Sequence, residues 1–161
     1  MFKKYQRVGV FVDVQNLFYS AKHLYDRKVD FEALLKLCVR GRALIRAFAY
    51  VVQTDELAQA NFIEKLTQIG YEVKTKTVRF RADGSAKGDW DMGIAIDTIS
   101  LHRKLDVIAL VSGDGDFVPL VNMLKANGVK VEVFSFSRST AEDLILAADE
   151  YFPLGEEVLM R

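Results

Sequence analysis

The apolar positions of this chain fall into two patterns that alternate along its length. One is a short, nearly continuous run rich in β-branched residues, which is typical of a strand buried on both faces. The clearest example covers residues 8–14. The same pattern predicts further strands over residues 43–52, 71–80, 106–111 and 129–136.

The other pattern has the period of a helix with one buried side, bounded by capping and turn residues. The predicted helices are 16–25; 31–39, between the cap Asp30 and Gly41; 55–69, opened by Asp55 and ended by Gly70, with the stripe Phe62, Ile63, Leu66 and Ile69; 89–102, capped by Asp89; 117–127, with Pro119 in its first turn and Gly128 after it; and a last helix with Ser139 and Glu142 as a capping box. Residues 83–85 have turn chemistry.

Alternating strands and helices predict an α/β fold with three layers, in which a mainly parallel sheet carries helices on both faces. The chain shows no internal repeat or linker, so we expect residues 1–161 to form a single domain. In such folds, sites form outside the carboxyl ends of the strands, where the strand order reverses.

Composition narrows the classes of function. Lys plus Arg and Asp plus Glu both number 22, so any contact with nucleic acid must come from a local basic patch. A single cysteine, Cys38, lies in an apolar helical pattern and indicates a buried thiol, and two histidines argue against structural zinc. With no apolar run long enough for a membrane span or signal peptide, we expect a cytoplasmic protein without a membrane partner.

Aspartates follow two of the predicted strands. Asp13 closes the first, Asp114 and Asp116 follow the strand at 106–111, and Asp91 lies near the start of a helix. Two carboxylates 4 Å apart repel each other by roughly 4 kcal/mol at an effective dielectric of about 20. A cation would relieve that repulsion, and oxygen ligands suit Mg²⁺ or Mn²⁺. Taken singly, each aspartate is better explained as a turn former or helix cap.

Other acidic sites fit the spacing less well. A calcium loop that starts at Asp114 needs a glutamate at its twelfth position, where Lys125 stands. A phosphate-transferring aspartate pair needs an acid at position 15, which is Gln15. Asp97 lies six residues after Asp91, about 120° around a helix, so Asp91 is the better ligand.

These segments resemble the signature blocks of the NYN domain, in its LabA-like branch (DUF88), a relative of the PIN nucleases. The blocks are Phe11-Val-Asp-Val-Gln-Asn16, Lys87-Gly-Asp-Trp-Asp91 with Asp97, and Ser112-Gly-Asp-Gly-Asp-Phe117. The resemblance implies a PIN-like (Rossmann-like) topology and a metal pocket of Asp13, Asp91, Asp114 and Asp116. It also implies that Asn16 orients Asp13 or a metal-bound water, that Ser112 fixes the Asp114 loop, that Lys87 faces a phosphate, and that Asp97 has a supporting role.

A local basic patch could bind a substrate backbone. Its members are Lys74, Lys76, Arg79, Arg81 and Lys87, with Phe80 and Trp90 beside them as surfaces for base stacking. A lysine-protected edge strand explains the same residues equally well. Ser135 leads toward a helix N-terminus that could hold a phosphate.

The sequence therefore predicts a Mg²⁺- or Mn²⁺-dependent endoribonuclease acting on RNA, with single-stranded RNA as the expected substrate. Two alternatives stay open at this point. One is a non-catalytic RNA-binding or regulatory module, and the other is a phosphatase or nucleotide hydrolase that uses the same pocket. Neither single-stranded DNA as a substrate nor assembly into a homo-oligomer is decided by these patterns.

Overall fold

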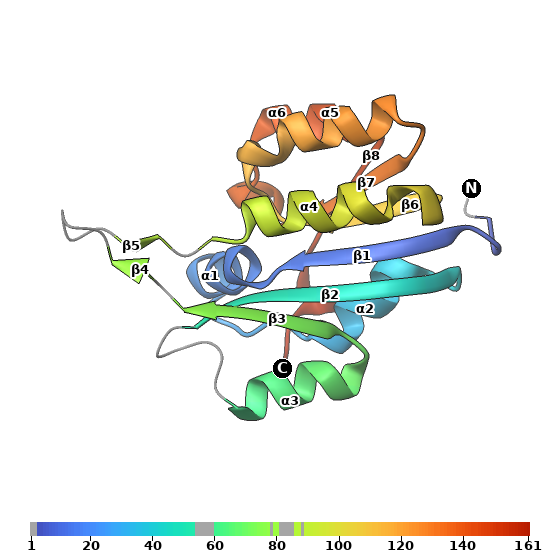
Figure 1. Ribbon diagram of the computed structural model, residues 1–161. Helices are drawn as coiled ribbons and strands as arrows, with labels where there is room; N and C mark the ends of the chain where they lie inside the picture. Colours follow the sequence, from blue (N-terminus) through green and yellow to red (C-terminus); the bar gives the residue numbers. More distant parts are fainter. Residues whose placement is uncertain (1–2, 54–59, 78, 81–85, 88) are drawn as a thin grey trace.

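The structure is a computed structural model that describes residues 3–53, 60–77, 79–80, 86–87 and 89–161, with only the backbone described for residues 79, 80, 86 and 87. Its centre is a sheet of six parallel strands in the order β3-β2-β1-β6-β7-β8 (Figure 1). The strands are β1 Arg7–Asp13, β2 Ala43–Gln53, β3 Glu72–Thr77, β6 Val107–Val111, β7 Lys130–Ser135 and β8 Glu150–Pro153. The chain runs outward from β1 to β3 and then returns to pair β6 with β1, so the order reverses between β1 and β6.

Helices cover both faces of the sheet, which confirms the predicted α/β architecture of three layers (Figure 1). One face carries α1 Val14–Tyr25, α2 Phe31–Val39 and α3 Ala60–Ile69, and the other carries α4 Asp91–Leu101, α5 Val118–Ala126 and α6 Glu142–Ala147. Short 3₁₀ turns follow several of these elements: η1 His102–Lys104, η2 Gly115–Phe117, η3 Ser137–Ser139 and η4 Glu156–Val158.

The strand β1 shows why the sequence pattern lacks simple alternation. Val8, Val10 and Val12 pack into the core beneath α1 and α2, whereas Phe11 packs into the core beneath α4 and α5. After the exposed Arg7, both faces of the strand are buried, so every position from Val8 to Val12 is apolar, and the strand ends at Asp13.

Several predicted helix boundaries are confirmed. The Asp30 carboxylate accepts a hydrogen bond from the Ala33 amide at 3.0 Å and caps α2. Gly70 follows α3 with a positive φ of 127°, a conformation that glycine adopts without a steric penalty. Pro119 lies in the first turn of α5, where its missing N–H removes no helical hydrogen bond.

The predicted strand over residues 71–80 is wrong as a single element. After β3 the chain leaves the sheet, and β4 Arg79–Phe80 pairs antiparallel with β5 Ala86–Lys87. The turn predicted at 83–85 and the helix start predicted at Asp55 lie outside the described residues.

Two predictions about the carboxyl-terminal part are also corrected. Ser139 and Glu142 form no capping box, because α6 begins only at Glu142 and the Ser139 hydroxyl donates to the Phe136 carbonyl. Helix α6 is short, from Glu142 to Ala147. The chain then continues into β8, an edge strand that the sequence pattern did not predict.

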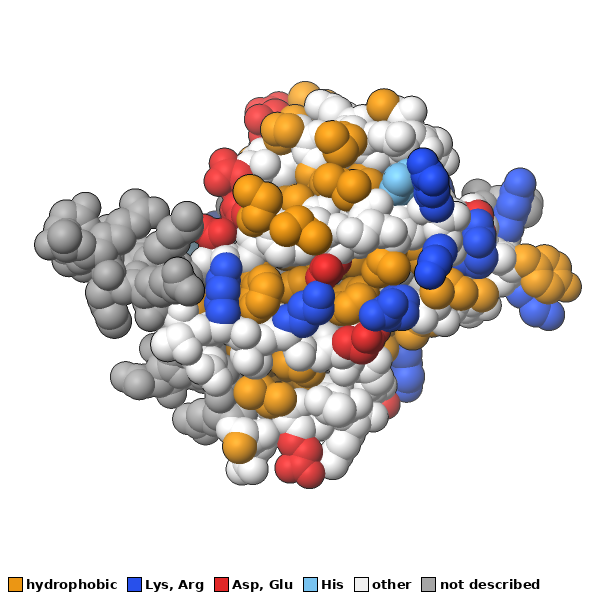
Figure 2. Space-filling model, viewed as in Figure 1, with side chains coloured by type: hydrophobic (Ala, Val, Ile, Leu, Met, Phe, Trp, Pro, Cys, Tyr) orange, Lys and Arg blue, Asp and Glu red, His pale blue; other side chains and the backbone are white. Residues whose placement is uncertain are grey.

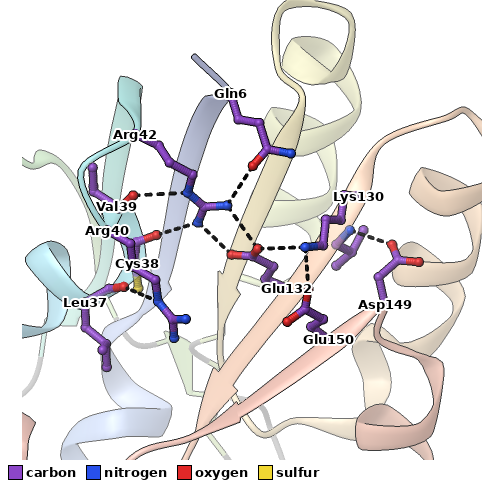
Figure 3. Close-up of polar contacts among 11 residues, drawn as sticks. Gln6, Leu37, Cys38, Val39, Arg40, Arg42, Lys130, Glu132, Asp149 and Glu150 are labelled. Atoms are coloured by element: carbon purple, nitrogen blue, oxygen red, sulfur yellow. Dashed lines mark hydrogen bonds and ion pairs between the residues drawn. The ribbon is translucent and has the colours of Figure 1, made fainter. Parts of the chain in front are cut away.

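A buried ionic network lies toward the amino-terminal ends of the strands (Figure 3). The Arg42 guanidinium donates to both Glu132 carboxylate oxygens at 2.8 and 3.0 Å, and both side chains are 0% exposed. Arg42 also donates to the carbonyls of Cys38 and Val39 and to Gln6. Lys130 pairs with Glu132 and with Glu150. Because the buried charges balance and are hydrogen-bonded, the interior tolerates them.

Two further findings bear on the predictions from composition. Cys38 is a buried free thiol, as expected, and burial raises its pKa. Within the described part of the chain, no helix combines the length and the apolar character needed to cross a membrane.

Candidate metal centre

Three carboxylates from two separate segments meet beyond the carboxyl ends of β1 and β6. Asp91 is the first residue of α4, and Asp114 and Asp116 belong to the turn after β6. One oxygen from each carboxylate lies within 4.8 Å of the other two. Asp91 and Asp114 are partly buried, and Asp116 is exposed. This juxtaposition occurs at the reversal of strand order, where parallel α/β sheets form their sites.

Asp13 lies behind this group, connected to it through a buried serine. The Ser112 hydroxyl donates to the Asp13 carboxylate at 2.9 Å and accepts from the Asp114 amide at 3.2 Å. The Asn16 amide also donates to Asp13, as part of the N-cap of α1. Asp13 is therefore joined by hydrogen bonds to the loop that carries Asp114.

The side chain of Asn16 contacts the same loop. Its carbonyl oxygen accepts from the Gly113 amide at 3.0 Å, so Asn16 holds the loop directly and its backbone contacts Asp13. Gly113 packs closely against the chain at Ser139 and Thr140, where an added Cβ would meet the Ser139 carbonyl oxygen at 2.7 Å. The loop after β6 thus follows one path because glycine permits this close approach.

One of the three acids, Asp114, stabilises the turn that follows β6. The Asp114 carboxylate accepts from the Asp116 amide at 2.9 Å and caps the 3₁₀ turn η2. Asp89 similarly accepts from the Asp91 amide at 3.3 Å, although Trp90, not Asp89 as predicted, is the N-cap residue of α4. The sequence had offered turn formation or helix capping as the alternative explanation of each aspartate. In the structure the aspartates both form such capping hydrogen bonds and lie close together.

The cluster is electrostatically unfavourable for ionised carboxylates. Partial burial, together with the negative charges of Asp114, Asp89, Asp13 and Asp116, raises the pKa of Asp91 to about 7. Burial raises the pKa of Asp13 to about 6, against the opposing effect of the hydrogen bonds from Ser112 and Asn16. A bound cation would relieve both effects, and hard carboxylate oxygens suit a hard divalent ion.

Asp97 points to a different place, as its angular separation from Asp91 predicted. Its carboxylate accepts from the Tyr50 hydroxyl at 2.7 Å and pairs with Lys74 at 2.6 Å. Tyr50 is fully buried in β2, and burial together with Asp97 raises its pKa. Asp97 therefore fastens α4 to β2 and β3, and sequence reasoning had no signal for Tyr50 as its partner.

Trp90 has a packing role next to the acids. Its indole N–H donates to the Val51 carbonyl at 3.1 Å, and its ring lies against Gly93, where an added Cβ would approach to 2.4 Å. The ammonium group of Lys76 lies 4.6 Å from the centre of the Trp90 ring. The ring thus positions the start of α4, and so Asp91, instead of standing free for base stacking.

The proposed substrate contacts divide into three cases. Ser112 is buried and bonded to Asp13. Ser135 is 1% exposed, and its hydroxyl bonds to Thr140 and Tyr151, so it faces the interior and not a phosphate in solvent. Arg79 and Lys87 face each other in register as backbone positions of β4 and β5, and Arg81 lies outside the described residues.

Residues 7–155 match the model of the NYN domain. The chain belongs to the NYN domain family. The match covers all six strands of the parallel sheet and the three acids that meet at its edge.

The chain is also similar to individual proteins, two by sequence and one by structure. The chain is 29% identical over 160 residues to the low amplitude and bright protein LabA of Synechococcus elongatus, which covers 93% of this chain and 84% of LabA. It is 30% identical over 108 residues to an uncharacterized protein of Methanocaldococcus jannaschii, 66% of this chain and 41% of that protein. A crystal structure of a protein of unknown function from Vibrio parahaemolyticus superposes with a TM-score of 0.90 at 33% identity, over 99% of both chains.

Proposed function

We propose that this NYN domain is a divalent-metal-dependent endoribonuclease that cleaves single-stranded RNA. The observation that carries the proposal is the meeting of Asp91, Asp114 and Asp116 within 4.8 Å at the reversal of strand order. Membership of the family supports it, because the NYN domain is related to the PIN nucleases. The acids raise the free energy of the folded protein unless a cation offsets their charge.

The residues have distinct roles in this proposal. Asp91, Asp114 and Asp116 would hold Mg²⁺ or Mn²⁺, with Asp13 as a further acid beneath them. Such an ion neutralises charge on a phosphodiester and makes water a better nucleophile. Ser112 and Asn16 position Asp13 and the Asp114 loop, since each is bonded to both sides of the junction between β1 and β6. Asp97 acts indirectly by fixing α4.

The substrate would approach from the side of α4 and β3. The ammonium group of Lys76 lies over the ring of Trp90, the residue immediately before α4. Lys74 precedes Lys76 by two residues on β3, so both side chains lie on the same face of that strand. Arg79, Arg81 and Lys87 belong to the same stretch of sequence and would add phosphate contacts. Substitution of Arg79 and Arg81 by alanine should lower the salt dependence of binding to single-stranded RNA, by about 0.7 units of slope for each lost contact.

The decisive experiment is cleavage of single-stranded RNA and single-stranded DNA of equal sequence, with Mn²⁺ and with EDTA. Asp114→Asn should lower the rate at least about a hundredfold, because a bound ion supplies several kcal/mol of transition-state stabilisation. Glu142→Gln is the matched control, since it removes an exposed charge from the neighbouring helix α6 without touching the three acids.

The alternatives give different results in the same experiment. RNA binding without cleavage in either condition would favour a regulatory module. Hydrolysis of a small phosphate ester, with RNA left intact, would favour a phosphatase. Cleavage that persists in EDTA and in Asp114→Asn would show that the activity does not come from this site.

A further inference from the structure

Helix α4 has two apolar sides, and among the described residues one of them is buried against the sheet while the other is largely exposed. Ile94 and Thr98 are fully buried and, with Leu101, face the sheet. Met92, Ile96 and Ile99 lie on the opposite side of the helix and are 73%, 56% and 40% exposed. A helix at the surface of a globular protein ordinarily presents polar residues to solvent, so this second stripe is unusual.

The exposed stripe has the spacing of a helix–helix contact. Met92, Ile96 and Ile99 follow at intervals of four and three residues, which form a single seam on an α-helix. Met123 of the neighbouring helix α5 is 50% exposed and extends the apolar surface. Figure 2 shows hydrophobic side chains gathered over α4 and α5 on this face. A stable interface buries about 800 Å² per partner, more than the seam of α4 alone, so its contact must extend onto α5.

Charge along α4 identifies the partner. The beginning of the helix is acidic, with Asp89, Asp91 and the nearby Asp116, whereas Arg103 and Lys104 follow its end and are exposed. Figure 2 shows the same separation, with acidic side chains at one end of α4 and basic side chains at the other. A second copy, turned by a twofold rotation, would place each basic end against an acidic end. The chain carries no net charge that would oppose self-association.

We propose that α4 is the interface of a symmetric homodimer, in which two α4 helices pack antiparallel with the twofold axis at Ile96. Ile96 then meets Ile96 of the partner subunit, and Met92 packs near Ile99 of the partner subunit. Arg103 of the partner subunit lies beside Asp89, next to the acidic edge of the metal centre. The dimer does not depend on the proposed ribonuclease activity, because its argument uses only the exposed stripe and the charges at its ends.

Sedimentation velocity of the full chain from about 1 μM to about 1 mM tests the proposal. Wild-type protein should reach the mass of a dimer, and Ile96→Glu should remain a monomer throughout. Tyr5→Glu is the control, because Tyr5 is 83% exposed and precedes β1, outside the stripe on α4. Circular dichroism of each variant verifies folding, which Ile96→Glu should preserve since the side chain faces solvent in the single chain.

Charge reversal tests the direction of the helices. Arg103→Glu and Asp89→Arg should each weaken the dimer about tenfold, because the twofold axis repeats every ion pair. The double variant should restore the wild-type dissociation constant, which a partner of any other orientation would not produce. Under mild oxidation Ile96→Cys should form a cross-linked dimer, since residues on the axis come close enough for a disulfide, and Tyr5→Cys should not.

The outcomes separate cleanly. A monomer at every concentration overturns the proposal. A dimer that survives Ile96→Glu, or one in which the double charge reversal is no better than the single variants, also overturns it. Loss of RNA cleavage in a variant that still dimerises concerns the proposed function and leaves the interface unaffected.

Discussion

Two groups of charged side chains lie at opposite ends of the same sheet, and they are treated in opposite ways. Around Glu132 the protein supplies its own cations, so that Arg42 and Lys130 balance the carboxylate in the interior (Figure 3). Around Asp91 the charged neighbours that shift its pKa most are four other aspartates. Folding pairs the Glu132 carboxylate with cations of the same chain, whereas around Asp91 folding brings negative charges together without a cation between them.

The difference supports the interpretation of the first group as structural and the proposal that the second is a metal site. A buried pair with full hydrogen bonding orients the elements that carry it and offers nothing to a ligand. A cluster of like charges opposes folding, and a fold retains such a cluster where binding a counter-ion is its purpose. The same contrast yields four expectations about stability and metal binding, from the largest effect to the smallest.

Breaking the buried pair of Arg42 and Glu132 should lower the free energy of unfolding more than any other change considered. Arg42→Met leaves the Glu132 carboxylate buried beside Lys130 alone, so the free energy of unfolding should fall by about 3–5 kcal/mol. Urea unfolding measures the loss. The control is Arg46→Met, which removes an exposed pair with Glu72 and should cost under about 1 kcal/mol. Equal losses in the two variants would contradict the structural role of the buried pair.

Binding of a divalent ion by Asp91, Asp114 and Asp116 should stabilise the folded protein. At a Mn²⁺ concentration a hundredfold above the dissociation constant, the free energy of unfolding should rise by about 2.7 kcal/mol. Asp114→Asn should lose most of that increment, because it removes one of the three converging carboxylates. Thermal melts of both proteins with Mn²⁺ and with EDTA measure the difference. A wild type that melts at one temperature in both solutions would mean that these acids serve only as caps.

Loosening the support of the acids should have an intermediate effect. Ser112→Ala removes the hydroxyl that joins Asp13 to the Asp114 amide, so the affinity for Mn²⁺ should fall about 10–100-fold. Isothermal titration calorimetry gives the dissociation constant. Thr98→Ala, another buried hydroxyl but one that bonds only within α4, should leave the affinity unchanged.

Removing one acid should stabilise the metal-free protein slightly, and only at high pH. The pKa of Asp91 is raised to about 7 and that of Asp13 to about 6, so these groups favour the folded state at low pH. That contribution is lost as the pH rises through 6 and 7. In EDTA, Asp91→Asn should therefore melt roughly 2–4 °C above wild type at pH 8, with a much smaller gap at pH 5. Equal gaps at both pH values would exclude repulsion as the cause.

Much of the fold was predictable because burial leaves a local pattern. Strands such as β1 and β6 are buried on both faces, so almost every residue in them is apolar. Asp30 and Gly70 mark helix ends through contacts with residues a few positions away. The parallel order of the sheet followed from the alternation of strands and helices, and this prediction is confirmed.

The errors concern elements whose boundaries depend on distant partners. The edge strand β8 is short and partly exposed, so it has no distinctive apolar run and exists because it pairs with β7. The stretch from Glu72 to Phe80 is uniformly suited to a strand, yet its last part pairs with β5 instead of continuing along β2. The sequence also suggested that Ser135 could contact a ligand, but in the structure its hydroxyl bonds to Thr140 and Tyr151.

The sequence by itself determined the alternation of elements and the placement of acids after two buried strands, because these depend on neighbours along the chain. The helical period already separated Asp97 from Asp91. Only the tertiary structure decided that Asp91 meets Asp114 and Asp116 and that Asp97 bonds to Tyr50 and Lys74. Pairing β1 with β6 sets the edge at which the acids meet, and packing of α4 on the sheet sets which of its faces carries each side chain. These contacts join residues that are 23 positions apart, as for Asp91 and Asp114, up to 99 positions apart, as for Val8 and Val107, and no local pattern encodes them.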